Sequence, residues 1–125
     1  MALLIIFIIC VCTGPCQEDW VFYEDSCYFQ SLTKKSWQIA EKKCVEKGSH
    51  LVVVNDLDFL SSIVKLSESY WIGLVEKKEG QWSWVDGTDY STTEQSIGKN
   101  SKMLWNDADC TLSFPYICEG KPKSH

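Results

Sequence analysis

The pattern of hydrophobic and polar residues indicates strands most clearly in two aromatic runs near the middle of the chain. In the second run, Trp82–Gly87, the two tryptophans alternate with serine and valine, and the run ends on an Asp-Gly turn. This period of two is typical of a strand. The first run, Tyr70–Leu74, consists of strand-forming residues around Gly73, which leaves room for another backbone or ring to approach. The pattern predicts a hairpin, connected by the polar segment 76–80, that the other elements cover as the core.

Two stretches before this hairpin have the apolar spacing of amphipathic helices. The first helix begins after Ser36 as its N-cap and ends at Gly48. Its inward positions are Trp37, Ala40, Cys44 and Val45. Asn55 caps the second helix, which ends before residues 67–69. Its apolar stripe comprises Leu57, Leu60 and Val64, with Phe59 and Ile63 beside it.

Short strands complete the pattern. Residues 20–23 and 26–29 predict a small hairpin around the acidic turn Glu24-Asp25. The polar stretch 89–101 has little apolar periodicity, so we interpret it as a loop that can carry function. Further strands are predicted at Leu51–Val54, Met103–Trp105 and Phe114–Cys118.

Size and charge restrict the classes of function. A chain of 125 residues forms one domain with a modest core. The net charge of −5 and the lack of a basic stripe argue against nucleic acid as a partner. All 12 basic residues are lysines, so the bidentate clamps that arginine forms on phosphate are absent from the sequence.

Catalytic patterns are absent from the sequence as well. Neither a Gly-x-Ser-x-Gly nucleophile motif nor a phosphate-binding loop occurs. His50 adjoins a predicted buried strand, where a structural role explains it better than catalysis. Asp56 and Asp58 stand at a helix start and suit capping and the helix dipole, while Cys110 lacks a sequence-evident base. We therefore predict that the chain is not an enzyme.

The N-terminal residues 2–12 form a continuous apolar run. This run is too short to span a bilayer, which takes about 20 apolar residues. It suits a signal peptide over residues 1–14, with small residues near the cleavage point. The alternative is the remnant of a longer signal anchor, and only in that case would the protein be anchored to a membrane. Both interpretations place the domain outside the cytosol, either secreted or on the extracellular face of the membrane.

Seven cysteines are many for a chain of this length, and five of them follow residue 15. These five contain no Cys-x-x-Cys pair, and neither histidine stands at a zinc-ligand spacing from a cysteine. Widely spaced cysteines in a small domain predict disulfides and hence an oxidising compartment.

The chain contains, in order, Cys16, Trp20, Cys27-Tyr28, Trp37, Ala40, Cys44, Leu51, Trp71-Ile72-Gly73-Leu74, Trp82, Trp84, Asp86-Gly87, Trp105-Asn106-Asp107, Cys110 and Tyr116-Ile117-Cys118. This order resembles the C-type lectin-like domain, in the extended form found in natural killer cell and myeloid lectin-like receptors. The resemblance covers residues 16–119 and leaves 120–125 as a tail. It implies an α+β fold in which two helices flank short antiparallel sheets, with a loop-rich upper region and disulfide staples.

The resemblance implies two disulfides, Cys16–Cys27 and Cys44–Cys118. Family members usually carry a further cysteine that pairs with the one at Cys110, but no cysteine lies between Cys44 and Cys110 here. Cys110 is therefore expected to be unpaired, or to link two chains as a disulfide-bonded dimer. The stretch 94–105 is also shorter than the family pattern, which leaves open a functional variant or a defective product.

Calcium-dependent sugar sites of this family use a Glu-Pro-Asn or Gln-Pro-Asp triplet together with the Asn and Asp of Trp-Asn-Asp. This chain keeps Asn106 and Asp107 but has Glu94-Gln95-Ser96 at the triplet position, without the proline. A calcium ion takes six to eight oxygen ligands, and the side chains of Glu94, Asn106 and Asp107 supply about three. We therefore favour a loop-capping role for Asn106 and Asp107 over calcium binding, and predict no other cofactor. The expected ligand-binding residues are Glu94, Ser96, Trp105, Asn106 and Asp107.

Two functions remain, and the partner in each is a cell-surface protein or a glycan. The first is calcium-independent binding of a protein such as an immune-cell receptor, as a soluble ligand or decoy. The second is a calcium-dependent, carbohydrate-binding lectin. The altered triplet favours the first function.

Overall fold

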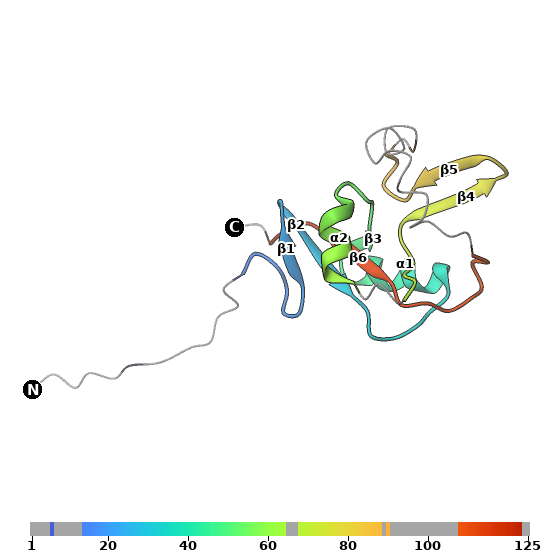
Figure 1. Cartoon of the computed structure of the whole chain (residues 1–125). Coiled ribbons are helices and arrows are strands. Elements are labelled where there is room, and N and C mark those ends of the chain that lie inside the picture. Colours follow the sequence, from blue (N-terminus) through green and yellow to red (C-terminus); the bar gives the residue numbers. More distant parts are fainter. Residues whose placement is uncertain (1–5, 7–13, 65–67, 89, 91–107, 124–125) are drawn as a thin grey trace, which may run out of the picture.

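The computed structural model describes residues 6, 14–64, 68–88, 90 and 108–123. The described part contains two helices and two antiparallel sheets (Figure 1), which confirms the predicted α+β class. Its elements are β1 (Val21–Tyr23), β2 (Ser26–Gln30), α1 (Trp37–Glu46), β3 (Ser49–Leu51), α2 (Leu57–Ile63), β4 (Leu74–Lys78), β5 (Gln81–Trp84) and β6 (Ile117–Gly120).

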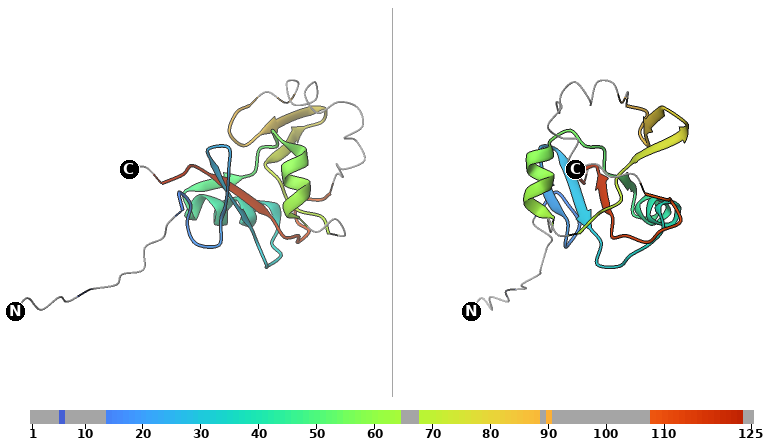
Figure 2. Two further views of the ribbon diagram at one scale, coloured as in Figure 1. Left: turned by 60° about the vertical axis from the view of Figure 1, so that its left-hand side comes forward. Right: turned by 45° about the vertical axis from the view of Figure 1, so that its right-hand side comes forward.

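The larger sheet has the strand order β1-β2-β6-β3, so the last strand of the chain lies between two early ones. Successive residues of β6 point to opposite faces of this sheet. Ile117 packs on one side with Leu60 of α2, and Cys118 packs on the other side with Ala40 and Cys44 of α1. The two helices therefore cover opposite faces of the sheet, as the two views in Figure 2 show.

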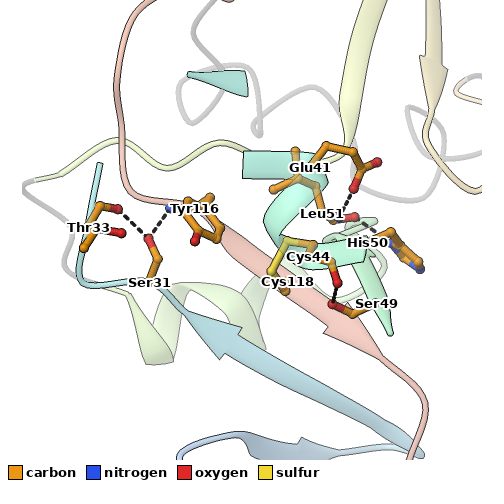
Figure 3. Close-up of a disulfide and its surroundings, with 9 residues drawn as sticks. All are labelled: Ser31, Thr33, Glu41, Cys44, Ser49, His50, Leu51, Tyr116 and Cys118. Atoms are coloured by element: carbon orange, nitrogen blue, oxygen red, sulfur yellow. Dashed lines mark hydrogen bonds between the residues drawn. A yellow bond between two sulfur atoms is a disulfide. The ribbon is translucent and has the colours of Figure 1, made fainter. Parts of the chain in front are cut away.

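The disulfide Cys44–Cys118 joins α1 to β6 inside the second of these layers, and both cysteines are fully buried. Two hydrogen bonds surround it (Figure 3): the Ser49 hydroxyl donates to the Cys44 carbonyl at 2.6 Å, and the Leu51 amide donates to Glu41 Oε1 at 2.8 Å. The two cysteines are 74 positions apart in the sequence, so closing this loop stabilises the fold by about 4 kcal/mol in the chain-entropy model.

The first hairpin forms where the alternation predicted it. Glu24 and Asp25 both adopt positive φ angles, 43° and 64°, as a tight two-residue hairpin turn requires. The disulfide Cys16–Cys27 ties the chain before β1 to β2. The Tyr23 ring stacks on Phe59 with centroids 3.9 Å apart, so the hairpin also packs on α2.

The central hairpin differs from the prediction. Its first strand begins only at Leu74, and the residues from Glu76 to Gln81 are exposed. The Trp71 amide instead donates to the Pro115 carbonyl at 2.8 Å, so this part of the aromatic run pairs with the C-terminal segment. The core lies around residues 51–54 and β6, and Trp84 is the buried residue through which the hairpin joins it.

Three local predictions are also wrong. Val45 is 60% exposed because it lies one residue past the buried Ala40–Cys44 stripe of α1. Asp56, not Asn55, caps α2, because its carboxylate reaches the Phe59 amide at 3.0 Å. The strand predicted over Leu51–Val54 ends at Leu51, because the Val53 amide bonds to a side chain, Glu119 Oε1, at 3.0 Å.

The C-terminal strand begins three residues later than predicted and ends two residues later. Phe114 and Tyr116 form only isolated bridges, to Lys35 and Trp71, and the regular strand is Ile117–Gly120. Gly120 still pairs with Cys27 and Ser49, so it belongs to the sheet and not to a tail.

Candidate functional site

The predicted ligand-binding residues, Glu94, Ser96, Trp105, Asn106 and Asp107, all lie outside the described residues. The structure does describe the two segments that border them, Trp82–Thr88 with Tyr90 on one side and residues 108–114 on the other. We refer to these bordering segments as the loop-flanking region.

Gly73 connects the β4–β5 hairpin, which contains the start of the segment Trp82–Thr88, to the core. Its amide donates to the Val52 carbonyl at 2.8 Å, and its own carbonyl accepts from the Val85 amide at 2.9 Å. A Cβ atom at this position would lie 2.6 Å from the Leu51 carbonyl oxygen. The close backbone approach that the sequence predicted at Gly73 is thus present. It joins the end of the β4–β5 hairpin to residues 51 and 52 of the core.

Two tryptophans on the same face of β5 have different environments. Trp84 is buried in the core, whereas Trp82 is only partly buried. The Trp82 ring lies 6.2 Å from the Tyr90 ring, centroid to centroid. Sequence reasoning did not single out Tyr90, although it lies at the start of the polar stretch. Together these rings form an aromatic surface next to the predicted ligand-binding loop.

Asp86 shapes the turn that follows β5. Its Oδ1 accepts a hydrogen bond from the Thr88 amide at 2.9 Å, and Gly87 adopts a φ of 88°. Partial burial raises the pKa of Asp86, but the hydrogen bonds from Thr88 and the charge of His50 outweigh this, so the pKa lies below its ordinary value. Asp86 is therefore an anionic turn residue at neutral pH.

Asp109 shapes the turn on the other side in a similar way. Its Oδ1 accepts from the Thr111 amide at 2.9 Å and from the Thr111 hydroxyl at 2.7 Å. These bonds, the backbone one first, hold the pKa of Asp109 below its ordinary value. Cys110, in the same turn, is free and exposed, and its carbonyl accepts from the Trp37 amide at 3.0 Å.

The remaining sites considered in the sequence have structural partners. The His50 ring nitrogen Nδ1 contacts the Leu51 carbonyl at 2.7 Å. Asp56 caps α2 and accepts a hydrogen bond from the Tyr23 hydroxyl at 2.7 Å. Within the described ranges, no group of three or more His, Cys, Asp or Glu side chains could hold a metal ion. The three expected calcium ligands lie outside those ranges, so the calcium prediction stays a prediction.

Comparison with known families decides the class of protein. Residues 33–120 match the family of lectin C-type domains, which is more than half of the chain. The chain belongs to the C-type lectin family.

Among its relatives, this C-type lectin domain is 32% identical to a hepatic lectin from Gallus gallus, over 85% of the chain and 60% of that protein. It is 34% identical to C-type lectin domain family 4 member E from Mus musculus, over 83% of the chain and 59% of that protein. The chain therefore spans about three fifths of the length of these relatives.

Solved structures of the family have the same fold. The domain of murine dendritic cell inhibitory receptor 2, in complex with an N-glycan, has a TM-score of 0.73 at 29% identity, covering 85% of this chain and 98% of that one. A calcium-independent type II antifreeze protein has a TM-score of 0.70 at 26% identity, covering 88% and 97%. The natural killer cell receptor Ly49C has a TM-score of 0.66 at 26% identity, covering 85% and 94%. The resemblance to natural killer and myeloid receptors is thereby confirmed.

Proposed function

We propose that this C-type lectin domain is an extracellular recognition module that binds a protein ligand, such as an immune-cell receptor, without calcium. The observation that carries this proposal is the triplet Glu94-Gln95-Ser96. It lacks the proline that presets the family's calcium loop, and serine replaces the final carbonyl-bearing side chain. Ordering a polar loop without that preset geometry costs roughly 1–2 kcal/mol per fixed residue.

The loop-flanking region supports a protein ligand. Trp82 and Tyr90 offer partly buried aromatic surface, the kind of surface that protein interfaces favour. The side chains of Asp86 and Asp109 accept backbone hydrogen bonds in the turns at the two borders of the region. A calcium-independent relative with a TM-score of 0.70 further supports the view that this fold does not need the ion.

Calcium-dependent carbohydrate binding is the second candidate. Asn106 and Asp107 are retained, and the murine dendritic cell inhibitory receptor 2 domain was solved with an N-glycan. The outcome depends on whether Glu94, Asn106 and Asp107 can assemble an oxygen shell around the ion.

Placement outside the cytosol belongs to the same proposal. The two disulfides support an oxidising compartment, and residues 1–14 would serve as a cleaved signal peptide or, alternatively, as a remnant anchor. No helix in the part of the chain that the structure describes is long and apolar enough to cross a membrane. N-terminal sequencing of protein expressed in mammalian cells tests the placement: a start between Thr13 and Cys16 in the medium supports cleavage, and an intact Met1 in the membrane fraction supports an anchor.

Binding to a set of immune-cell receptors, measured with calcium and with EDTA, tests the function. The protein-ligand proposal expects binding to one receptor at equal affinity in both buffers. Binding to a mannose or galactose resin that EDTA abolishes would replace it with the carbohydrate function.

A further inference from the structure

Three lysines surround a shallow hollow at the end of the domain where the first and last described segments meet. Lys47 follows α1, whereas Lys121 and Lys123 follow β6. The Lys123 amide donates to the Pro15 carbonyl at 2.7 Å, which holds the two segments together. The rest of the lining is Pro15, Cys16, Gln17, Trp20, Cys27, Gly48 and Gly120. We call this surface the basic hollow.

The basic hollow lies away from the loop-flanking region. Figures 1 and 2 show the β4–β5 hairpin at one end of the domain and the β1–β2 hairpin, whose Cys27 lines the hollow, toward the other end. A ligand in the basic hollow would therefore leave the loop-flanking region accessible.

The charge of the basic hollow is opposite to that of the whole chain. Its lining contains three lysines and no acidic residue, although the chain has a net charge of −5. Glu18 and Asp19 are exposed in the turn between the lining residues Gln17 and Trp20 but do not themselves line the hollow. Among the described residues, the ion pair that forms is Lys43 with Glu46, so none of the three lysines is neutralised by a carboxylate within 4 Å.

Aromatic packing positions one of these charges. The Lys47 ammonium lies 5.2 Å from the centroid of the Phe29 ring, at cation–π distance. The Phe29 ring in turn stacks on Trp20 with centroids 5.4 Å apart. The Phe29 ring thus contacts both Lys47 and the partly buried Trp20, and these two residues line the same hollow.

We propose that the basic hollow binds an acidic polysaccharide through its sulfate or carboxylate groups. Three lysines that line one hollow, with no acidic residue in the lining, favour a polyanion, and lysine binds such groups as a flexible point charge. The choice of ligand rests on the extracellular placement proposed above, because anionic lipid surfaces belong to the cytoplasmic leaflet. The linear charge of a polysaccharide also allows one chain to meet all three lysines.

Binding of a heparin-derived oligosaccharide, measured by calorimetry at low and physiological ionic strength, tests this proposal. The variant Lys47→Gln/Lys121→Gln/Lys123→Gln removes the three charges. The matched control, Lys34→Gln/Lys77→Gln/Lys78→Gln, removes three exposed charges elsewhere, so both variants have the same net charge. Equal melting temperatures of the two variants and the parent chain establish that all are folded.

We expect the hollow variant to bind about tenfold more weakly, since three exposed ion pairs of modest strength combine to about that factor. The control should change affinity by less than about twofold, and binding should weaken with salt. An equal loss in both variants, or no binding by the parent chain, would overturn the proposal. Binding to vesicles containing phosphatidylserine but not to the oligosaccharide would also overturn it, in favour of a membrane. Receptor binding should be the same in both variants, so failure here is separable from failure of the proposed function.

Discussion

Replacing Gly73 by alanine should destabilise the domain, because the added methyl group has no space. Its Cβ would lie 2.6 Å from the Leu51 carbonyl oxygen, 2.8 Å from Val85 Cγ2 and 3.0 Å from the Val52 carbonyl oxygen. Two of these three atoms belong to the backbone, so no side-chain rotation can remove the clash. The hairpin must shift, and this strains the hydrogen bonds that Gly73 makes to Val52 and Val85.

The magnitude follows from two opposing effects. Overpacking a close contact costs about 1–3 kcal/mol. Replacing glycine by alanine also lowers the conformational entropy of the unfolded chain, which stabilises the fold by about 0.4–1 kcal/mol. We therefore expect Gly73→Ala to lower the free energy of unfolding by about 1–2 kcal/mol, which corresponds to a melting temperature lower by about 5 °C or more.

Thermal melting and urea denaturation of the disulfide-intact protein measure this loss. Lys77→Ala is the control, because Lys77 is an exposed residue of β4, in the same hairpin that Gly73 precedes. The control should melt within about 1 °C of the parent chain, as expected for a surface substitution. A Gly73→Ala variant that melts with the control would contradict the close approach of the hairpin to residues 51 and 52.

Two further predictions concern Asp56 and Cys110. The hydrogen bond from the Phe59 amide, then that from the Tyr23 hydroxyl, holds the pKa of Asp56 below its ordinary value of 3.8. The carboxylate therefore stabilises the fold above that pH, and the stabilisation is lost as the pH falls through the lower folded-state pKa. Acid denaturation should thus depend less steeply on pH in Asp56→Asn than in the parent chain, and identical profiles would refute this role. Peptide mapping without reduction should find Cys110 unpaired or linked to a second chain, in which case Cys110→Ser abolishes the dimer; a bond from Cys110 to Cys27 or Cys44 would contradict the disulfide framework.

Local chemistry made several elements predictable from the sequence. The acidic turn at Glu24-Asp25 and the glycine after α1 require particular backbone angles, and both are found where they were expected. Cys44 and Cys118 could be paired only through the family resemblance, because spacing alone leaves the connectivity of five cysteines open. The α+β fold class was likewise predicted from this resemblance.

Long-range competition for backbone groups explains where the predictions were wrong. Val53 has the apolar neighbours of a strand residue, but its amide donates a hydrogen bond to the side chain of Glu119, 66 residues away. Trp71 lies in a run of strand-forming residues, but its amide donates to the Pro115 carbonyl instead of to a hairpin partner. The basic hollow could not be predicted from the sequence either. Lys47 lies more than 70 positions from Lys121, and only the pairing of β3 with β6 brings them to the same hollow.

The central claim is that recognition does not need calcium, and thermal melting in EDTA and in millimolar calcium tests it most directly. Three side-chain oxygens, from Glu94, Asn106 and Asp107, are too few for the six to eight that the ion takes. The account predicts the same melting temperature in both buffers for the parent chain and for Asp107→Ala. A calcium-induced rise of several degrees that disappears in Asp107→Ala would contradict it and would establish a calcium site in this C-type lectin domain.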